Sequence, residues 1–296
     1  MVGCTASGKS ALSLELARRL GDVEIVTVDS MQVYRGMDIG TAKPSRVERA
    51  EVPHHLIDLA DPDEEWSVAR WADAARRAVA GIEERGHRVL LVGGTGLYFS
   101  AVVDALQPPA QYPEVRADLD AEPDTARLYR RLEVLDPVAA GRMEPTNRRR
   151  VVRALEVCVG SGRPFSSFGP GMTAFPATTW RIAGLWLPRA VVARRITERL
   201  TGMVAAGLVD EVDRLRRRAG GLSRTARQAL GYREVLAHLE SGVPLPDAID
   251  EADRRTRSFA RRQRVWWRRD PRVEWYGESD NPFACVGQIL GNWEQP

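Results

Sequence analysis

The sequence predicts an α/β protein with a P-loop NTPase-like parallel sheet core flanked by helices and a small all-helical insertion domain. Three observations predict it. A phosphate-loop pattern, G-x-x-x-x-G-K-S, fills residues 3–10 and leads into a helical pattern. Two apolar segments, 23–28 and 89–92, are typical of the buried strands of a parallel sheet, and a turn follows each of them. Residues 108–176 show only helical patterns. We therefore expect a core of residues 1–107 and 177–296 and an insertion of residues 108–176.

Composition agrees with a globular protein. Of the 296 residues, 44% are hydrophobic and 28% are charged, and the net charge is +3. No apolar run is long enough to span a membrane. The cysteines Cys4, Cys158 and Cys285 are scattered, and this fits a reducing compartment better than a disulfide framework. We expect a cytoplasmic protein without a membrane partner.

The phosphate loop carries the clearest chemistry. Its glycines let successive backbone N–H groups point at one anion, and the following helix adds its positive end. Lys9 supplies a charge for the terminal phosphate, and the Ser10 hydroxyl can hold Mg²⁺. The residues expected around the anion are Gly3, Cys4, Thr5, Ala6, Ser7, Gly8, Lys9 and Ser10. A helix is expected to follow, because Leu12, Leu16 and Leu20 recur on one face before Gly21.

Only Met1 and Val2 precede this loop, where a buried strand normally stands. Such a strand holds the loop in shape. Either the chain uses a stub as its central strand or the natural start lies upstream. We expect the second: an apolar segment upstream of Met1 in the natural chain, and marginal stability without it.

The segment 23–28 is rich in β-branched residues and ends at Asp29. Ligands of parallel sheets bind beyond the carboxyl ends of the strands, so Asp29 stands where chemistry is expected. By position alone, a general base and a magnesium ligand are equally good interpretations. Residues 31–44 are rich in turn formers, and we expect a loop across the site.

The next elements are expected to be a strand over 53–59 and an amphipathic helix over 67–85. The apolar strand 89–92 then ends in Gly93-Gly94-Thr95-Gly96, which opens a helix over 97–106. This second turn can hold an anion. No acid ends this strand, and that counts against ordinary ATP hydrolysis.

In the insertion we expect helices over 113–121, 124–135 and 146–159. The last one begins with a cluster of cations, Arg149, Arg150 and Arg153. A solvated helix face and an anion-binding surface explain this cluster equally well.

After a strand over 180–187, a long helix carries Arg194, Arg195 and Arg199. Further helices are expected over 234–240 and 247–269. The last helix interleaves arginines with Phe259 and Trp266, a pattern that favours a reader of nucleic-acid phosphates over a merely solvated helix. Of all the basic residues only Lys9 and Lys43 are lysines. A compact ammonium suits a phosphate loop better than a planar guanidinium.

Several motifs, in order along the chain, resemble the bacterial tRNA dimethylallyltransferase family. They are G-C-T-A-S-G-K-S, V-D-S-M-Q-V-Y-R-G-M-D-I-G-T-A-K-P, P-H-H-L-I-D, L-V-G-G-T-G-L-Y, R-A-L-E-V, Q-A-L-G-Y-R-E and T-R-S-F-A-R-R-Q. The long second motif is the most specific. The chain departs from the family at its missing first strand and at Cys4, where proline is usual.

The resemblance implies transfer of a prenyl group from dimethylallyl diphosphate to N6 of the adenosine on the 3′ side of a tRNA anticodon. Asp29 would take the N6 proton, and Lys9, Ser10, Thr95 and Arg199 would surround the diphosphate, with Mg²⁺ held through Ser10. The anticodon stem-loop would be contacted by Asp29, Ser30, Met31, Gln32, Arg149, Arg150, Arg153, Gln228, Gly231, Tyr232, Arg233, Arg261, Arg262 and Gln263. A monomer is expected.

Three other functions would use part of this pattern. A small-molecule P-loop kinase would use the loop and Asp29 but not the arginine-rich helices. An adenylate prenyltransferase acting on free AMP would need neither the insertion nor the basic helix. A non-enzymatic RNA-binding module would make no use of Lys9, Ser10 and Asp29.

Overall fold

The structure is a computed structural model that describes residues 1–106, 108–169, 171–172, 174–277 and 280–294. The chain forms two compact units, Met1–Asp104 with Ala177–Pro296, and Ala105–Pro176. The first boundary thus lies between Asp104 and Ala105. Residue 107, where the sequence placed it, lies outside the described residues.

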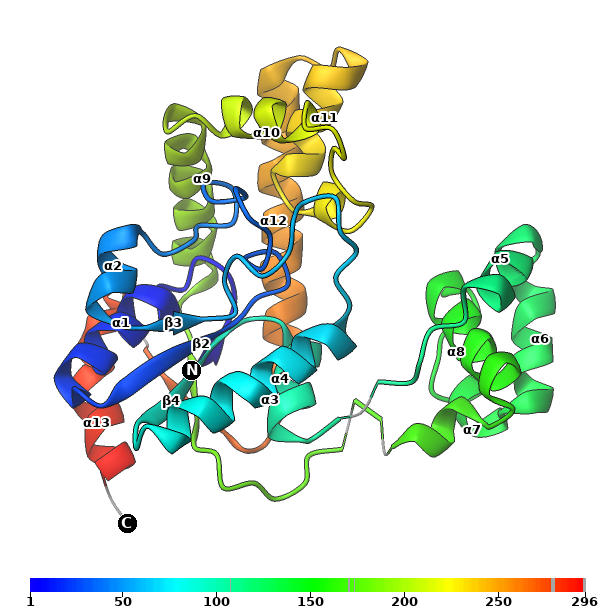
Figure 1. The fold of residues 1–296 in the computed structure, drawn as a ribbon, viewed down its shortest axis with the longest axis horizontal. Helices are drawn as coiled ribbons and strands as arrows, with labels where there is room; N and C mark the ends of the chain where they lie inside the picture. The colour runs from blue at the N-terminus through cyan, green and yellow to red at the C-terminus, as the bar shows by residue number, and fades with distance from the viewer. Residues whose placement is uncertain (107, 170, 173, 278–279, 295–296) are drawn as a thin grey trace. The chain divides into compact units, whose positions relative to one another are not determined.

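A parallel sheet of six strands forms the centre of the first unit, in the order β3-β2-β4-β1-β5-β6 (Figure 1). The strands are β1 (Val2–Gly3), β2 (Val23–Val28), β3 (His54–His55), β4 (Arg88–Gly93), β5 (Ile182–Leu185) and β6 (Val273–Tyr276). The α/β fold class is confirmed. The strand expected over 53–59 is shorter than predicted, and β6 was not anticipated.

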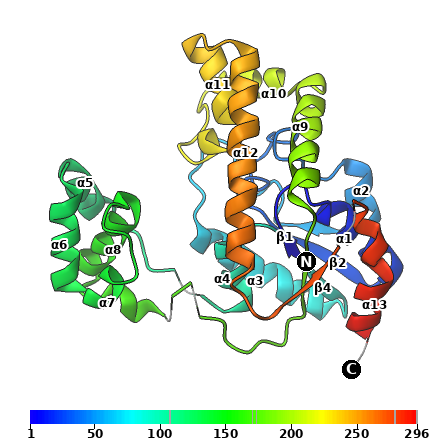
Figure 2. The ribbon, with the colours of Figure 1, turned by 180° about the vertical axis from the view of Figure 1, so that it is seen from behind.

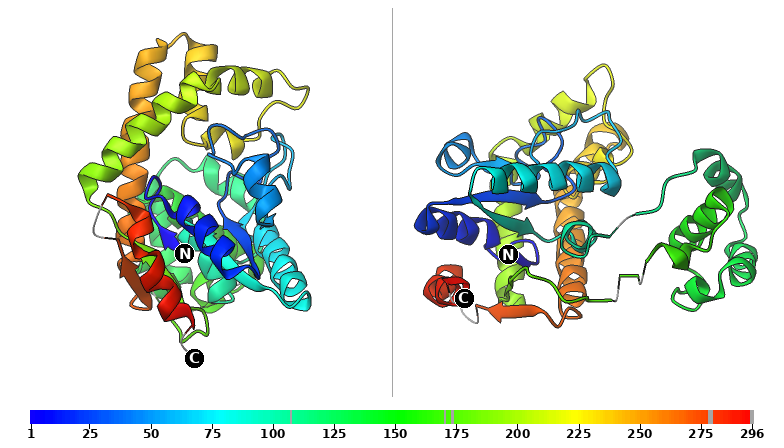
Figure 3. Two further views of the ribbon diagram at one scale, coloured as in Figure 1. Left: turned by 90° about the vertical axis from the view of Figure 1, so that its left-hand side faces the viewer. Right: turned by 60° about the horizontal axis from the view of Figure 1, so that its bottom comes forward.

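Helices cover both faces of this sheet because its strands are apolar on both sides. The helices of this unit are α1 (Lys9–Leu20), α2 (Arg46–Glu51), α3 (Val68–Glu84), α4 (Gly96–Val103), α9 (Arg189–Ala205), α10 (Leu208–Arg216), α11 (Tyr232–Ser241), α12 (Leu245–Trp267) and α13 (Val286–Glu294). Ile25 and Leu90 pack with α1 and α13, whereas Val26 and Leu91 pack with α3 and α4, which gives three layers (Figure 3).

Strand β1 is short but central, with β4 on one side and β5 on the other. Met1 and Val2 are buried, and the Met1 nitrogen donates a hydrogen bond to the Leu91 carbonyl at 2.7 Å. The phosphate loop therefore starts from the middle of the sheet, and the two residues Val2–Gly3 form the strand that supports it.

Helices α9 and α12 are neighbours, and α12 also packs against α4, α11 and β1 (Figure 2). Helix α4 ends at Val103, earlier than the expected residue 106. Its end is followed by Ala105 in a left-handed conformation, φ 48°, which cannot continue a right-handed helix. The described helices α2, α10 and α13 were not predicted from the sequence.

The second unit is a small helical bundle. It contains α5 (Pro113–Ala121), α6 (Thr125–Leu135), α7 (Pro137–Ala140) and α8 (Arg148–Ser161). Its own core forms around Leu128, Leu132 and Leu155, each at most 3% exposed. The three predicted helices are confirmed, and the short α7 and a 3₁₀ helix over Phe165–Phe168 are additional.

Candidate active site

The phosphate loop joins β1 to α1, and its shape requires glycine at Gly8. This residue has φ 90°, and a Cβ atom there would lie 2.8 Å from Cγ of Pro282. Lys9 begins α1, so the loop's backbone N–H groups and the positive end of the helix act on the same place. Ser10 is exposed in the first turn of α1, while Cys4 and Ser7 are buried.

Three basic side chains converge on this loop. Lys9 Nζ donates to the Cys4 carbonyl at 3.2 Å, and Arg199 Nη2 donates to the Thr5 hydroxyl at 2.8 Å. Arg195 Nη1 donates to the Ser7 carbonyl at 3.3 Å. Sequence reasoning missed the role of Arg195, although its position four residues before Arg199 places both on one side of a helix.

The electrostatic environment favours an anion between these groups. Burial lowers the pKa of Lys9 below its ordinary value; Asp29 opposes this shift, and the positive charge of Arg199 adds to it. Burial also lowers the pKa of Arg199, again against the influence of Asp29. Two desolvated cations thus lie within electrostatic reach of one carboxylate, and a polyanionic ligand would stabilise their charged forms.

Asp29 follows β2 and is half-buried beside these cations. Its Oδ1 accepts hydrogen bonds from the backbone N–H groups of Met31, at 2.8 Å, and Gln32, at 3.4 Å. This local turn fixes the direction of the carboxylate. Among the hydrogen bonds of the described residues, none is directed to Oδ2, which is thus available to a substrate. Ser30 and Met31 beside it are also half-buried.

Gln263 of α12 connects the phosphate loop to the turn between β4 and α4. Its Oε1 accepts from Thr5 N–H at 2.8 Å, and its Nε2 donates to the Gly94 carbonyl at 3.0 Å. The sequence analysis placed Gln263 on the tRNA-contacting surface. The structure instead buries it, 6% exposed, because both ends of its amide are used inside the protein. Thr95, beside Gly94, is half-buried.

The loop 31–44 is fixed by buried polar contacts. Glu211 of α10, 1% exposed, accepts hydrogen bonds from the backbone N–H groups of Ile39, at 2.9 Å, and of both its neighbours, Asp38 and Gly40. It also accepts the Tyr232 hydroxyl proton. Tyr232 was expected to contact tRNA, yet it is fully buried, since its ring packs where a Cβ on Gly40 would stand.

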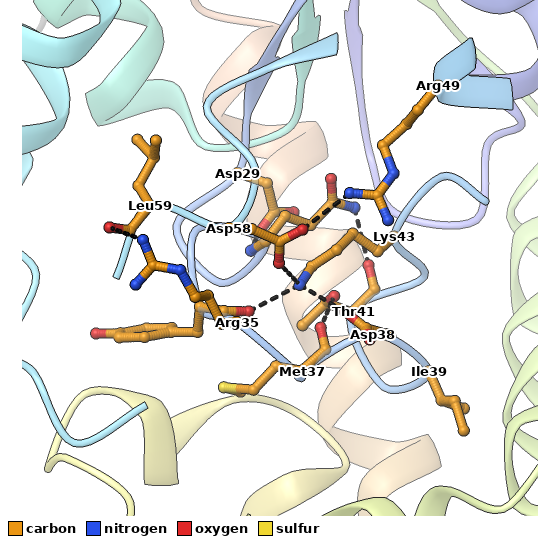
Figure 4. A network of polar contacts seen from close by, with 12 residues as sticks. Asp29, Arg35, Met37, Asp38, Ile39, Thr41, Lys43, Arg49, Asp58 and Leu59 are labelled. Atoms are coloured by element: carbon orange, nitrogen blue, oxygen red, sulfur yellow. Dashed lines mark hydrogen bonds and ion pairs between the residues drawn. The ribbon is translucent and has the colours of Figure 1, made fainter. Parts of the chain in front are cut away.

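On the other side of this loop, Lys43 lies among carbonyl and carboxylate oxygens (Figure 4). Gln32 is also buried there, and its amide donates to the carbonyls of Thr41, at 2.9 Å, and Ala42, at 3.3 Å. The loop that follows Asp29 is therefore held on one side by Glu211 of α10 and on the other by Lys43 and Gln32 of its own motif.

A basic surface follows α12. Arg261 and Arg262 are exposed, as are Gln228 and Arg233 near the start of α11, whereas Gly231 is buried at that helix start. A groove between α9 and α12 has an apolar floor and a rim of arginines. Its lining residues are Arg189, Val192, Ala193, Ile196, Arg257, Ala260, Arg261 and Arg264.

The helical unit carries the remaining predicted contacts. Arg149 and Arg150 are exposed at the start of α8. Arg153 differs from them, because its guanidinium donates to the Pro109 carbonyl at 2.7 Å and to Glu156 Oε1 at 2.8 Å. Its charge is thus used within the unit.

No group of three or more His, Cys, Asp or Glu side chains in the described ranges is arranged to hold a metal. Nor does any helix in that part of the chain combine the length and apolar character of a membrane span.

The model of the IPP transferase family matches residues 32–270. The tRNA dimethylallyltransferase of Desulforudis audaxviator is 44% identical over all of this chain and 97% of that protein. That of Geobacter metallireducens is 46% identical over 98% of this chain and 95% of that protein.

Solved structures agree. The tRNA isopentenylpyrophosphate transferase of Bacillus halodurans superposes with a TM-score of 0.70 at 39% identity, over 99% of this chain and 95% of that one. A eukaryotic dimethylallyltransferase acting on tRNA superposes with a TM-score of 0.73 at 27% identity, over 90% of this chain and 68% of that one.

Proposed function

Because the chain belongs to the IPP transferase family, and is an enzyme that transfers a dimethylallyl group to tRNA, we propose that dimethylallyl diphosphate is its donor and N6 of the adenosine 3′ to the anticodon its acceptor. The observation that carries this proposal is the meeting of Asp29, Lys9 and Arg199 at the carboxyl ends of the strands. A base and two cations face one place there.

The diphosphate of the donor occupies the phosphate loop. Lys9 and Arg199 turn from the Cys4 carbonyl and the Thr5 hydroxyl toward its oxygens, and Arg195 reinforces their charge. Charge grows on the diphosphate as the bond from its oxygen to the prenyl carbon breaks. Cations and N–H groups that are already oriented stabilise this charge without reorganisation, and in enzymes such stabilisation is usually the largest electrostatic contribution.

One side chain beside the loop fits Mg²⁺. The exposed Ser10 hydroxyl begins α1 and is a hard oxygen ligand of the kind that Mg²⁺ prefers, to be completed by phosphate oxygens. Bound there, Mg²⁺ would supply further positive charge to the leaving diphosphate.

Asp29 acts as the general base. The N6 lone pair is delocalised into the adenine ring, so N6 is a weak nucleophile. As N6 forms its bond to the prenyl carbon, the bonding electrons leave with the diphosphate and one N6 proton passes to Asp29 Oδ2. Its Oδ1 remains bound to the Met31 and Gln32 N–H groups, so the carboxylate keeps its direction.

The tRNA is held mainly through its phosphates. Exposed arginines on α12 and α11, and Arg149 and Arg150 on the helical unit, supply the charge. The target adenosine leaves its stack to reach the half-buried Asp29, as in enzymes that modify bases. We place this reaction in the cytoplasm and assign it to a monomer.

One experiment separates this function from its competitors. The protein is incubated with dimethylallyl diphosphate and an anticodon stem-loop, AMP or ATP, and the nucleosides are analysed by mass. The proposal expects a prenylated adenosine only with the stem-loop, and loss of donor use in Lys9→Ala. Prenylated AMP, or ATP turnover that depends on Lys9, would contradict it.

A further inference from the structure

Lys43 is one of only two lysines among 43 basic residues. The other, Lys9, belongs to the phosphate loop. Lys43 is remote from that loop in sequence, and its side chain is 1% exposed. A chain that uses arginine almost everywhere else retains an ammonium at this buried position, and the surroundings give the reason.

The ammonium of Lys43 has an acceptor for each of its three protons (Figure 4). Nζ donates to the Tyr34 carbonyl at 2.7 Å, to Asp38 Oδ1 at 2.7 Å and to Asp58 Oδ1 at 2.6 Å. The three acceptors surround a single atom. A planar guanidinium spreads its donors over three nitrogens and cannot place three of them at one point.

Asp58 links this ammonium to Gln32. Its Oδ2 accepts from Arg49 at 2.8 Å, and its backbone N–H donates to the Gln32 carbonyl at 3.2 Å. Asp58 has φ 57°, a conformation that needs support in a residue with a side chain. Burial would raise the pKa of this carboxyl, but the hydrogen bonds from Lys43 and Arg49 outweigh burial and hold the pKa below its usual value.

The Gln32 side chain is also held by residues just before Lys43 in the loop. Its amide donates to the carbonyls of Thr41 and Ala42, and Ala42 directly precedes Lys43. The Gln32 carbonyl is thus held by the Asp58 N–H. The Gln32 side chain is held by the carbonyls of the two residues that precede Lys43. Its N–H group, in turn, is one of the two that orient Asp29 Oδ1.

We propose that Lys43 is a positioning residue for the transfer reaction: through Asp58 and Gln32, it holds the carboxylate of Asp29 in the direction of the substrate amine. This inference rests on the proposed role of Asp29 as base. Lys43 itself touches neither substrate. Small displacements of a reacting group cost rate even when their origin is remote, by up to about 100-fold per ångström.

The test uses the full chain and Lys43→Met, which retains an unbranched apolar stem and removes all three donors. In folded protein, identified by circular dichroism and active-site titration, the single-turnover rate should fall about 10- to 100-fold. Affinity for the stem-loop and for the donor should remain within about 2-fold, because no substrate contact is lost.

Two further variants keep the test decisive. Asp58→Asn suits the left-handed backbone, since asparagine tolerates positive φ, and should show the same fall in rate at unchanged affinities if Lys43→Met does not fold. Arg49→Met removes the other cation on Asp58 but leaves the Lys43 contacts, and should change the rate per active site little. A folded Lys43→Met or Asp58→Asn with the wild-type single-turnover rate would overturn the inference.

Asp29→Asn separates this inference from the function beneath it. If that variant transfers the prenyl group normally, the role of Asp29 itself fails. If it is inactive while Lys43→Met behaves as wild type, only the positioning role of Lys43 fails.

Discussion

Thr5 and Gln263, separated by 258 positions in the sequence, are joined by a hydrogen bond of 2.8 Å between the Thr5 N–H and Gln263 Oε1. The same amide reaches the Gly94 carbonyl through Nε2. One side chain of the basic helix α12 therefore sets the spacing between the phosphate loop and the turn that opens α4. The helix that exposes Arg261 and Arg262 thus also supports the phosphate loop.

Gln263→Leu should disturb both turns. The substitution keeps the side-chain size but leaves the Thr5 N–H and the Gly94 carbonyl without their partner, at a cost of about 1–3 kcal/mol for each buried polar group. Unfolding in denaturant should show lower stability, and the KM for dimethylallyl diphosphate should rise. Gln288→Leu on the exposed face of α13 is the control. Unchanged stability and KM in Gln263→Leu would show that the bond is unimportant.

Gly96→Ala should destabilise the protein through overpacking. A Cβ atom at this position would stand 1.9 Å from Trp266 Nε1, so the indole or the turn must move. Such overpacking costs about 1–3 kcal/mol. Gly202→Ala is the matched control, since nothing lies within 4 Å of its added Cβ and it stands inside α9, where alanine is favoured by about 0.5–1 kcal/mol. The prediction is tested by the midpoint temperature of thermal unfolding of both variants. A Gly96→Ala protein as stable as wild type would refute the packing argument.

The double substitution Arg261→Ala with Arg262→Ala should weaken tRNA binding without altering the chemical step. Each phosphate contact that is lost should lower the slope of log affinity against log salt by about one. Binding is measured over a range of salt concentrations, with Arg76→Ala and Arg77→Ala on the exposed face of α3 as the control pair. An unchanged slope would show that Arg261 and Arg262 contact no tRNA phosphate and only face solvent.

Stability should fall in acid as Glu24 is protonated. Glu24 is 3% exposed and accepts hydrogen bonds from Arg85, His55 and His87. The Arg85 guanidinium, with help from the two histidines, lowers its pKa from 4.5 to about 2. The folded state therefore binds fewer protons than the unfolded state, so this stabilisation is complete above pH 4.5 and is lost as the pH falls toward 2.

Glu24→Gln should flatten the stability curve in this window. The free energy of unfolding is measured against pH for both proteins, with the exposed Glu83→Gln as control. Curves of equal slope for wild type and Glu24→Gln would contradict the assignment.

Much of the fold could be predicted because its signals are local. The phosphate loop, the helix up to Leu20 and the strand up to Val28 are each written in a few consecutive residues, and the structure has them there. Strand β6 and helix α13 escaped prediction because short, mixed segments depend on the sheet and on α1 for their order.

The site could be predicted only in part. Residue types showed which side chains carry charge, but not where their partners lie. Arg153 looked like an anion-binding cation, yet its guanidinium donates hydrogen bonds to Glu156 and to the Pro109 carbonyl. Tyr232 and Gln263 stand in motifs expected to contact tRNA, yet the fold buries both, because their partners come from distant segments.

The central claim, that Asp29 takes the proton from the adenine amine, is tested most directly by the single-turnover rate of Asp29→Asn with saturating donor and stem-loop. Asparagine keeps the Oδ1 that accepts the Met31 N–H, so the loop should stay in place. The account predicts that formation of the prenylated nucleoside slows by about 10²–10⁴-fold while stem-loop affinity is nearly unchanged. A variant that transfers the prenyl group at close to the wild-type rate would contradict it.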